Sequence, residues 1–95
     1  MFSLSDKVAM VTGASQGIGR VIARVLSEAG AHVVCVARTE KKIKSLADEI
    51  NGRGESASHL PCDISNGDAF SDSINTTVKQ HGRLDILINN AGITR

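Results

Sequence analysis

The sequence contains no tyrosine and no tryptophan, and it has only two cysteines and one proline among its 95 residues. Cys35 and Cys62 stand far apart, with no Cys-x-x-Cys pair and no cluster of cysteine and histidine around them. This pattern excludes the usual zinc and disulfide-exchange motifs, so we expect two structural thiols. The three histidines, His32, His59 and His81, have no metal-ligand spacing either. We expect surface or helix-end roles for them, and no metal site.

Long apolar runs and an excess of one charge are also missing. The longest uninterrupted apolar run, residues 33–37, is far shorter than the roughly 20 residues that cross a bilayer. Residues 1–7 lack the basic start and the apolar core of a secretion signal. The net charge of +1 offers no broad basic surface for nucleic acid or for an anionic membrane. We therefore expect one small cytoplasmic domain without nucleic-acid or membrane partners.

Hydrophobic periodicity predicts an alternation of strands and helices. Four short apolar runs, residues 8–11, 32–37, 57–60 and 84–88, do not alternate with polar residues, as is typical of parallel strands covered on both faces. Between them, apolar residues recur at helical spacing. The three stripes are Ile18, Val21, Ile22, Val25, Leu26 and Ala29; Ile43, Leu46, Ala47 and Ile50; and Phe70, Ile74, Thr77 and Val78. This order predicts an α/β fold of the Rossmann type, a doubly wound parallel sheet with strand order 3-2-1-4.

The predicted helices also have end signals. A glycine follows each stripe, at positions 30, 52 and 82, where a left-handed residue commonly ends a helix. Ser65 with Asp68 resembles a capping box for the third helix, and Thr39 is placed to cap the second.

Three glycines occupy the predicted turn from the first strand into the first helix, in the segment VTGASQGIGR of residues 11–20. The unpaired N–H groups and the positive dipole at the start of a helix attract a pyrophosphate. Gly13 would permit the tight turn, Gly17 the close approach of the phosphates, and Gly19 the close packing of helix on strand. The spacing G-x-x-x-G-x-G is neither the G-x-G-x-x-G fingerprint nor a P-loop, and a purely structural glycine turn is the alternative.

Three motifs together resemble the short-chain dehydrogenase/reductase family: TGASQGIGR at residues 12–20, CDI at 62–64 and NNAG at 89–92. The resemblance covers the whole chain, and the ending NNAGITR is similar to bacterial-type 3-oxoacyl-[acyl-carrier-protein] reductases of fatty acid biosynthesis. It implies an oxidoreductase, homotetrameric at full length, that uses a nicotinamide dinucleotide to reduce a carbonyl substrate linked to acyl carrier protein. A family member acting on another ketone or alcohol, and a non-catalytic NADP-binding module, are the alternatives.

The resemblance also implies which residues bind the dinucleotide. Asp63 would accept from the adenine amino group with Ile64 against the ring, and Asn90 would contact the ribose toward the nicotinamide. Asp63 is alternatively a turn residue, and the stretch around Asn90 alternatively braces the sheet, as we expect for Asn89. The full implied set is Gly13, Ser15, Gln16, Gly17, Ile18, Gly19, Arg38, Asp63, Ile64, Asn90, Ala91 and Gly92.

Arg38 predicts which of the two nicotinamide cofactors is used. An enzyme that prefers NAD usually has an acid about 20 residues beyond the glycines, whereas this sequence has Arg38 at that place. The planar guanidinium suits the 2′-phosphate of NADP, so we expect NADP(H), with a solvated surface arginine as the alternative. Gln16 stands where relatives that prefer NADP often have a second basic residue, and we expect the discrimination to be weaker for that reason.

The remaining basic residues and the missing tyrosine limit which functions we expect of this chain. We expect Lys41, Lys42 and Lys44 on the solvated face of the second helix, with contact to an acidic carrier protein as the alternative. The family's Tyr-x-x-x-Lys motif, catalytic serine and further asparagine have no counterpart here, so no catalytic residue is predicted in this chain. Because hydride transfer to a carbonyl needs a proton donor, we expect residues 1–95 to be the N-terminal part of a single NADP-binding domain without turnover of its own.

Overall fold

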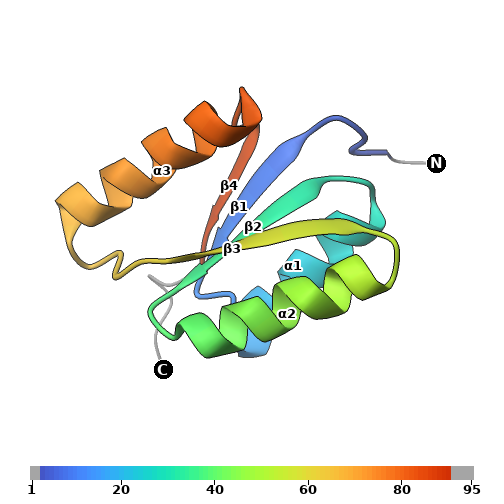
Figure 1. Ribbon diagram of the computed structural model, residues 1–95, viewed down its shortest axis with the longest axis horizontal. Coiled ribbons are helices and arrows are strands. Elements are labelled where there is room, and N and C mark those ends of the chain that lie inside the picture. Colours follow the sequence, from blue (N-terminus) through green and yellow to red (C-terminus); the bar gives the residue numbers. More distant parts are fainter. Residues whose placement is uncertain (1–2, 91–95) are drawn as a thin grey trace.

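The computed structural model describes residues 3–90 and contains four strands and three helices that alternate along the chain (Figure 1). Each predicted strand and helix is present. The elements are β1 (Val8–Thr12), α1 (Gly17–Glu28), β2 (His32–Ala37), α2 (Glu40–Gly52), β3 (Ser56–Pro61), α3 (Gly67–His81) and β4 (Ile86–Asn89).

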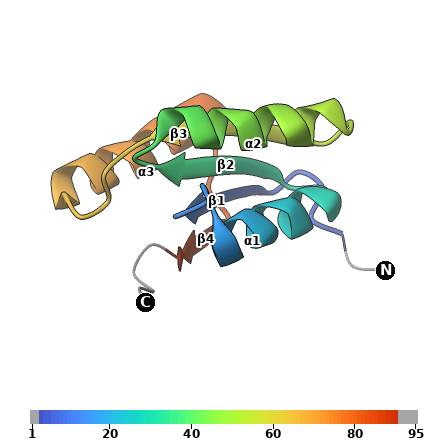
Figure 2. The ribbon, with the colours of Figure 1, turned by 90° about the horizontal axis from the view of Figure 1, so that it is seen from below.

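The four strands form one parallel sheet in the order β3-β2-β1-β4, which confirms the predicted topology. β1 lies between β2 and β4, so that Val11 is opposite Cys35 on one side and Ile88 on the other. Figures 1 and 2 show α1 and α2 on one face of the sheet and α3 on the other. Within residues 3–90, every helix falls short of the length and apolar character that a membrane span needs.

β4 begins two residues later than predicted, and the preceding Asp85 contacts β1 through both its backbone and its side chain. The Asp85 carboxylate accepts from the Val8 N–H at 2.8 Å, where a parallel strand would offer a backbone carbonyl. Arg83 holds that carboxylate in place through two hydrogen bonds of 2.8 Å. The Asp85 N–H itself donates to the Val8 carbonyl at 2.9 Å, so at this position one of two ladder bonds is made by a side chain.

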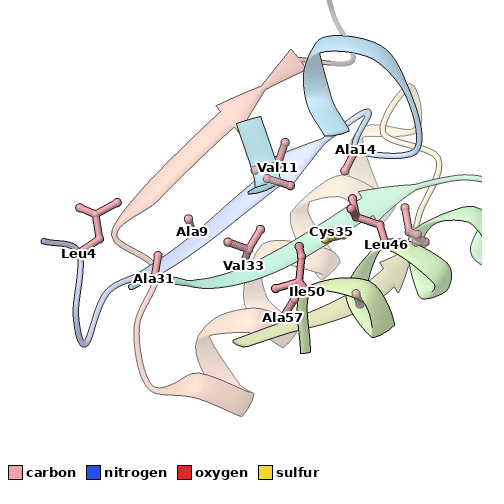
Figure 3. Close-up of a cluster of buried hydrophobic side chains, with 13 residues drawn as sticks. Leu4, Ala9, Val11, Ala14, Ala31, Val33, Cys35, Leu46, Ile50 and Ala57 are labelled. Atoms are coloured by element: carbon pink, nitrogen blue, oxygen red, sulfur yellow. The ribbon is translucent and has the colours of Figure 1, made fainter. Parts of the chain in front are cut away.

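Side chains of the central strands alternate between two apolar layers. The larger layer includes Val11, Val33 and Cys35 and lies beneath α1 and α2, where it also buries the whole predicted stripe of α2 (Figure 3). The smaller layer packs against α3 and consists of Val8, Met10, Val34 and Val36. Both faces of β1 and β2 are therefore buried, as their non-alternating sequences predict.

The stripe predicted for α1 is only partly buried. Ile18, Val21 and Val25 are 65%, 56% and 57% exposed, whereas the fully buried positions of α1 hold Gly19, Ala23 and Ser27. Small residues face the sheet because α1 approaches it closely, and the larger apolar residues are displaced to the flank of the helix. α3 shows a smaller shift: Thr77 of its predicted stripe is buried, but Ser73 is buried as well and Val78 is 43% exposed.

Two predicted helix-end signals are wrong. The N-cap of α3 is Asn66, whose side-chain oxygen accepts a backbone N–H at 3.1 Å, because the Ser65 hydroxyl is already bonded to Asp63. The helical hydrogen bonding of α2 continues through Gly52, so the left-handed position falls on Gly54 with φ of 85°. The glycines at positions 30 and 82 do take left-handed conformations, as predicted.

A pair of histidines joins α3 to the sheet at the amino-terminal end of β2. The rings of His32 and His81 have centroids 4.4 Å apart. The ring nitrogens of His32 lie 2.5 Å from the Ser56 hydroxyl and 3.0 Å from the Ser58 hydroxyl. Burial, and secondly the proximity of His81, lower the pKa of His32.

This histidine makes stability depend on pH near neutrality. Because the pKa of His32 is lowered on folding, the unfolded chain binds more protons, and stability rises with pH. Above about pH 6.5, His32 is neutral in both the folded and the unfolded chain, and the free energy of unfolding is unaffected by its titration. Below that pH the unfolded chain takes up the proton more readily, so the free energy of unfolding falls. Denaturant unfolding between about pH 5 and pH 8 measures the profile. His32→Gln should flatten it and His59→Gln should not; an unchanged slope in His32→Gln would contradict the assignment.

Candidate functional site

The carboxyl ends of the four strands meet at one edge of the sheet. Gly13 follows β1, Arg38 follows β2, Cys62 follows β3 and Asn90 follows β4. A pocket of about 530 Å³ opens at this edge. It is lined by Gly13, Ser15, Gln16, Ala37, Arg38, Thr39, Lys42, Cys62, Asp63, Ile64 and Ser65. Parallel sheets of this kind bind ligands at this edge, near the strand where the order reverses.

The loop between β1 and α1 depends on its glycines in two different ways. Gly17 has φ of 61°, a left-handed conformation, and an added Cβ there would meet nothing within 4 Å. A Cβ on Gly19 would lie 2.2 Å from the carbonyl oxygen of Gly13 and 2.8 Å from the side-chain nitrogen of Asn90. Gly19 is therefore needed because the backbone of the loop passes close to it. Gly17 is needed for its left-handed conformation, and the space beside Gly17 is open.

The start of α1 is open to an anion. Within residues 3–90, no side chain caps this helix, and its first turn holds no acidic residue. The first N–H groups of a helix lack intrahelical partners and carry the positive end of its dipole. Since Gly13, Ser15 and Gln16 line the pocket immediately before α1, these N–H groups are presented at the pocket's edge.

Asp63 is held by the residue two positions further along. The Ser65 hydroxyl donates to Asp63 Oδ1 at 2.6 Å and the Ser65 N–H donates to the same oxygen at 3.0 Å. These hydrogen bonds, and more weakly the charge of Arg38, lower the pKa of Asp63. The carboxylate is therefore an acceptor at neutral pH, and within the described part of the chain its Oδ2 has no donor.

Polar side chains at the end of β4 tie it to β1. Thr12 donates to the side-chain oxygen of Asn89 at 3.0 Å, so Asn89 has the structural role expected of it. The Asn90 side-chain nitrogen donates to the Gly13 carbonyl at 3.4 Å and so helps to hold the glycine loop. The other two residues predicted here, Ala91 and Gly92, lie outside the described residues.

The structure brings half of the implied set together on the pocket wall. Those lining it are Gly13, Ser15, Gln16, Arg38, Asp63 and Ile64. Gly17 lines an adjoining depression of about 510 Å³, and Ile18 is exposed at the start of α1. Neither Gly19 nor Asn90 lines the pocket, and both instead contact the glycine loop.

Five residues that line the pocket were not predicted as site residues: Ala37, Thr39, Lys42, Cys62 and Ser65. Thr39 and Lys42 come from the connection between β2 and α2. Both belong to the start of α2, which begins only two residues after Arg38, so its first turn must lie at the same edge of the sheet. Thr39 is the N-cap by position, as predicted, yet within residues 3–90 its hydroxyl makes no capping bond. The short β2–α2 turn was the signal that could have placed them here.

The cysteines and histidines do not form a metal site in the described residues, where no group of three or more candidate ligands could hold an ion. Cys35 is buried, and burial raises its pKa to about 12, which suits a structural thiol. Cys62 is half-buried and lines the pocket, so it is also part of the candidate site.

Comparison with known proteins gives consistent matches over almost the whole chain. The sequence pattern described as short chain dehydrogenase matches residues 7–95. A short chain dehydrogenase of Pseudocercospora fijiensis is 45% identical over 92 residues, which cover 97% of this chain and 30% of the relative. Oxidoreductase UcpA of Salmonella typhimurium is 39% identical over 95 residues, covering 100% and 36%. A fatty acyl-CoA reductase of Acinetobacter baylyi is 40% identical over 90 residues, covering 95% and 30%.

Solved structures match at the same coverage. A metagenomic short-chain oxidoreductase in complex with NADP superposes with a TM-score of 0.90 at 46% identity, covering 95% of this chain and 41% of that protein. A hydroxysteroid dehydrogenase from Escherichia coli gives 0.88 at 34% identity, covering 92% and 37%. The chain thus spans about a third of the length of the curated relatives it matches.

Proposed function

We propose a function from one premise: the chain belongs to the short-chain dehydrogenase/reductase family. In this proposal residues 1–95 are the N-terminal part of a single domain of an NADP-dependent oxidoreductase, and its catalytic groups belong to the remainder of the full-length protein. The observation that carries the proposal is the pocket at the carboxyl edge of the sheet, which joins the glycine loop to Arg38.

The residues of the pocket fit NADP(H). The open start of α1 suits a pyrophosphate, and the Asp63 carboxylate suits the amino group of adenine. Arg38 is exposed and, within residues 3–90, forms no ion pair, so its guanidinium is available for a 2′-phosphate. The NADP complex of the metagenomic oxidoreductase, 46% identical to this chain, supports the same choice of cofactor.

Bound NADPH would supply a hydride to a carbonyl carbon. The residues of this chain would bind and orient it: the first N–H groups of α1 and the Ser15 hydroxyl would donate to the phosphates, and Asp63 would fix the adenine. Asn90 would act indirectly, by holding the Gly13 carbonyl. The proton for the product alcohol would come from the tyrosine of the family's Tyr-x-x-x-Lys motif, which is not among residues 1–95.

The substrate we propose is a 3-oxoacyl group carried by acyl carrier protein, reduced in fatty acid biosynthesis by a cytoplasmic homotetramer. The ending NNAGITR supports it, as does the similarity to a fatty acyl-CoA reductase. The varied names of the relatives favour the broader alternative of another ketone or alcohol. NADPH oxidation by the natural protein, measured with 3-oxoacyl thioesters and with simple ketones in parallel, distinguishes the two.

Arg38→Ala tests the choice of cofactor. We expect it to weaken NADPH binding by about 1–3 kcal/mol, because a charge-assisted hydrogen bond to the 2′-phosphate is lost. NADH binding should change little, since NADH carries no phosphate at that position. Calorimetric titration of the natural protein with both cofactors measures the difference.

The matched control is Arg53→Ala, which removes an exposed arginine beyond the other end of α2, 3.7 Å from Glu28. It should leave both affinities unchanged. If Arg38→Ala weakens NADPH and NADH equally, Arg38 does not recognise the 2′-phosphate.

A further inference from the structure

The three lysines at the start of α2 have different surroundings. Lys44 Nζ lies 2.9 Å from the Asp48 carboxylate one turn further along the same helix. Lys41 lines the depression beside the pocket, and Lys42 lines both this depression and the pocket itself. All three lysines are exposed, as predicted, but Lys42 differs from Lys44 in that it also lines the pocket.

Lys42 and Arg38 belong to one short segment. Arg38 is the first residue after β2, and Lys42 is the third residue of α2. Side chains of a helix lean toward its N-terminus, so the Lys42 stem leans back toward the place where the chain leaves β2. Both residues line the same pocket, together with Thr39 between them.

Lys42 also lines the same two hollows as Gln16, the uncharged residue of the glycine loop. Ser15, Gln16 and Lys42 are the residues shared by the pocket and the adjoining depression. Gln16 is the place in the glycine loop where a second cation was expected and is missing. Lys42 therefore places a positive charge of α2 between the pocket and the adjoining depression, where Gln16 of the glycine loop supplies none.

The negative charges near this segment do not cancel the two cations. Glu40 Oε2 lies 3.5 Å from His59 Nε2, and Glu40 does not line the pocket. Asp63 is the one acidic residue among the described residues that line it. Within residues 3–90, neither Arg38 nor Lys42 forms an ion pair. The pocket wall therefore carries an excess of positive charge.

We propose that Arg38 and Lys42 together form a two-cation clamp for the 2′-phosphate of the cofactor, with Lys42 supplying the charge that Gln16 does not. The assignment rests on the proposed function. A phosphate monoester carries a charge of about −1.5 to −2 at pH 7, so two cations match it better than one. Arg38 offers a planar pair of donors, and Lys42 a compact charge on a flexible stem.

The test uses 2′,5′-ADP and 5′-AMP, which differ only in the 2′-phosphate, titrated calorimetrically into the natural protein. Lys42→Met keeps most of the stem and removes the charge. We expect it to weaken 2′,5′-ADP binding about tenfold, as for loss of one charge-assisted contact, and to change 5′-AMP binding by less than about twofold. Lys42→Arg keeps the positive charge and should retain most of the affinity for 2′,5′-ADP. Lys44→Met, on the same helix but outside the pocket, should behave as the unmodified protein.

The outcomes separate the clamp from the function on which it rests. If Lys42→Met binds 2′,5′-ADP normally while Arg38→Ala does not, the clamp is wrong and the proposed function stands. If Lys42→Met weakens both ligands equally, Lys42 acts on something other than the 2′-phosphate and the clamp is again wrong. If the unmodified protein binds 5′-AMP as tightly as 2′,5′-ADP, the NADP preference itself fails, and the clamp fails with it.

Discussion

Gly19→Ala is expected to abolish measurable NADPH binding and to destabilise the fold. The new Cβ would lie 2.2 Å from the Gly13 carbonyl oxygen, a backbone atom that can yield only if the whole loop moves. Overpacking of this kind costs about 1–3 kcal/mol of stability. A displaced loop also loses its hydrogen bonds to charged phosphates, and losing two of these at about 1.5–3 kcal/mol each weakens binding more than about 100-fold.

Calorimetry and denaturant unfolding of the natural protein measure both effects. Gly52→Ala is the matched control, because a Cβ there meets nothing within 4 Å and the residue lies in the last turn of α2. It should leave binding intact and leave stability unchanged or slightly raised. Normal NADPH affinity in Gly19→Ala would mean that the pyrophosphate does not bind at this loop.

Residues 1–95, produced alone, are expected to self-associate, to bind NADPH weakly and to show no reductase turnover. Within residues 3–90, β4 pairs only with β1, so its other edge offers free N–H and C=O groups. The exposed flank of α1 adds apolar surface through Ile18, Val21 and Val25. Both features favour association between copies of the fragment over a stable monomer.

Analytical ultracentrifugation over a range of concentrations tests this expectation. Leu87→Lys places a charge on the edge strand and should shift the distribution toward monomer. Val78→Lys is the control, since Leu87 and Val78 are both 43% exposed but Val78 lies on α3. A single monomeric species at all concentrations would overturn the expectation and favour a self-sufficient binding module.

The fold could be predicted because its signals are local and redundant. Non-alternating runs such as residues 32–37 indicate strands buried on both faces, and the stripe of α2 is fully buried as expected. The stripe of α1 misled because periodicity records which residues are apolar and not how closely a helix approaches the sheet. Where Gly19 and Ala23 allow close contact, larger residues such as Val25 are moved to the flank.

The candidate site could be predicted in outline, including the charges of Arg38 and Asp63, but without Lys42. Gly13, Arg38 and Asp63 follow three neighbouring strands, and parallel strands bring their carboxyl ends to one edge. The direction of a long side chain on a helix surface depends on its partners, and only those one turn away on the same helix can be read from the sequence. Lys44 has Asp48 one turn away, whereas Lys42 is left facing the pocket. Competition between partners also explains Ser65, because its hydroxyl donates to Asp63 and does not cap α3.

Amide hydrogen exchange of the natural protein with and without NADPH tests the central claim most directly. The account predicts that NADPH slows exchange in residues 14–19, 38–42 and 62–65, which follow β1, β2 and β3 at the carboxyl edge of the sheet. Residues 30–32 and 53–56, at the opposite edge, should be unaffected. Protection confined to the opposite edge, or no protection with NADPH at saturation, would contradict it.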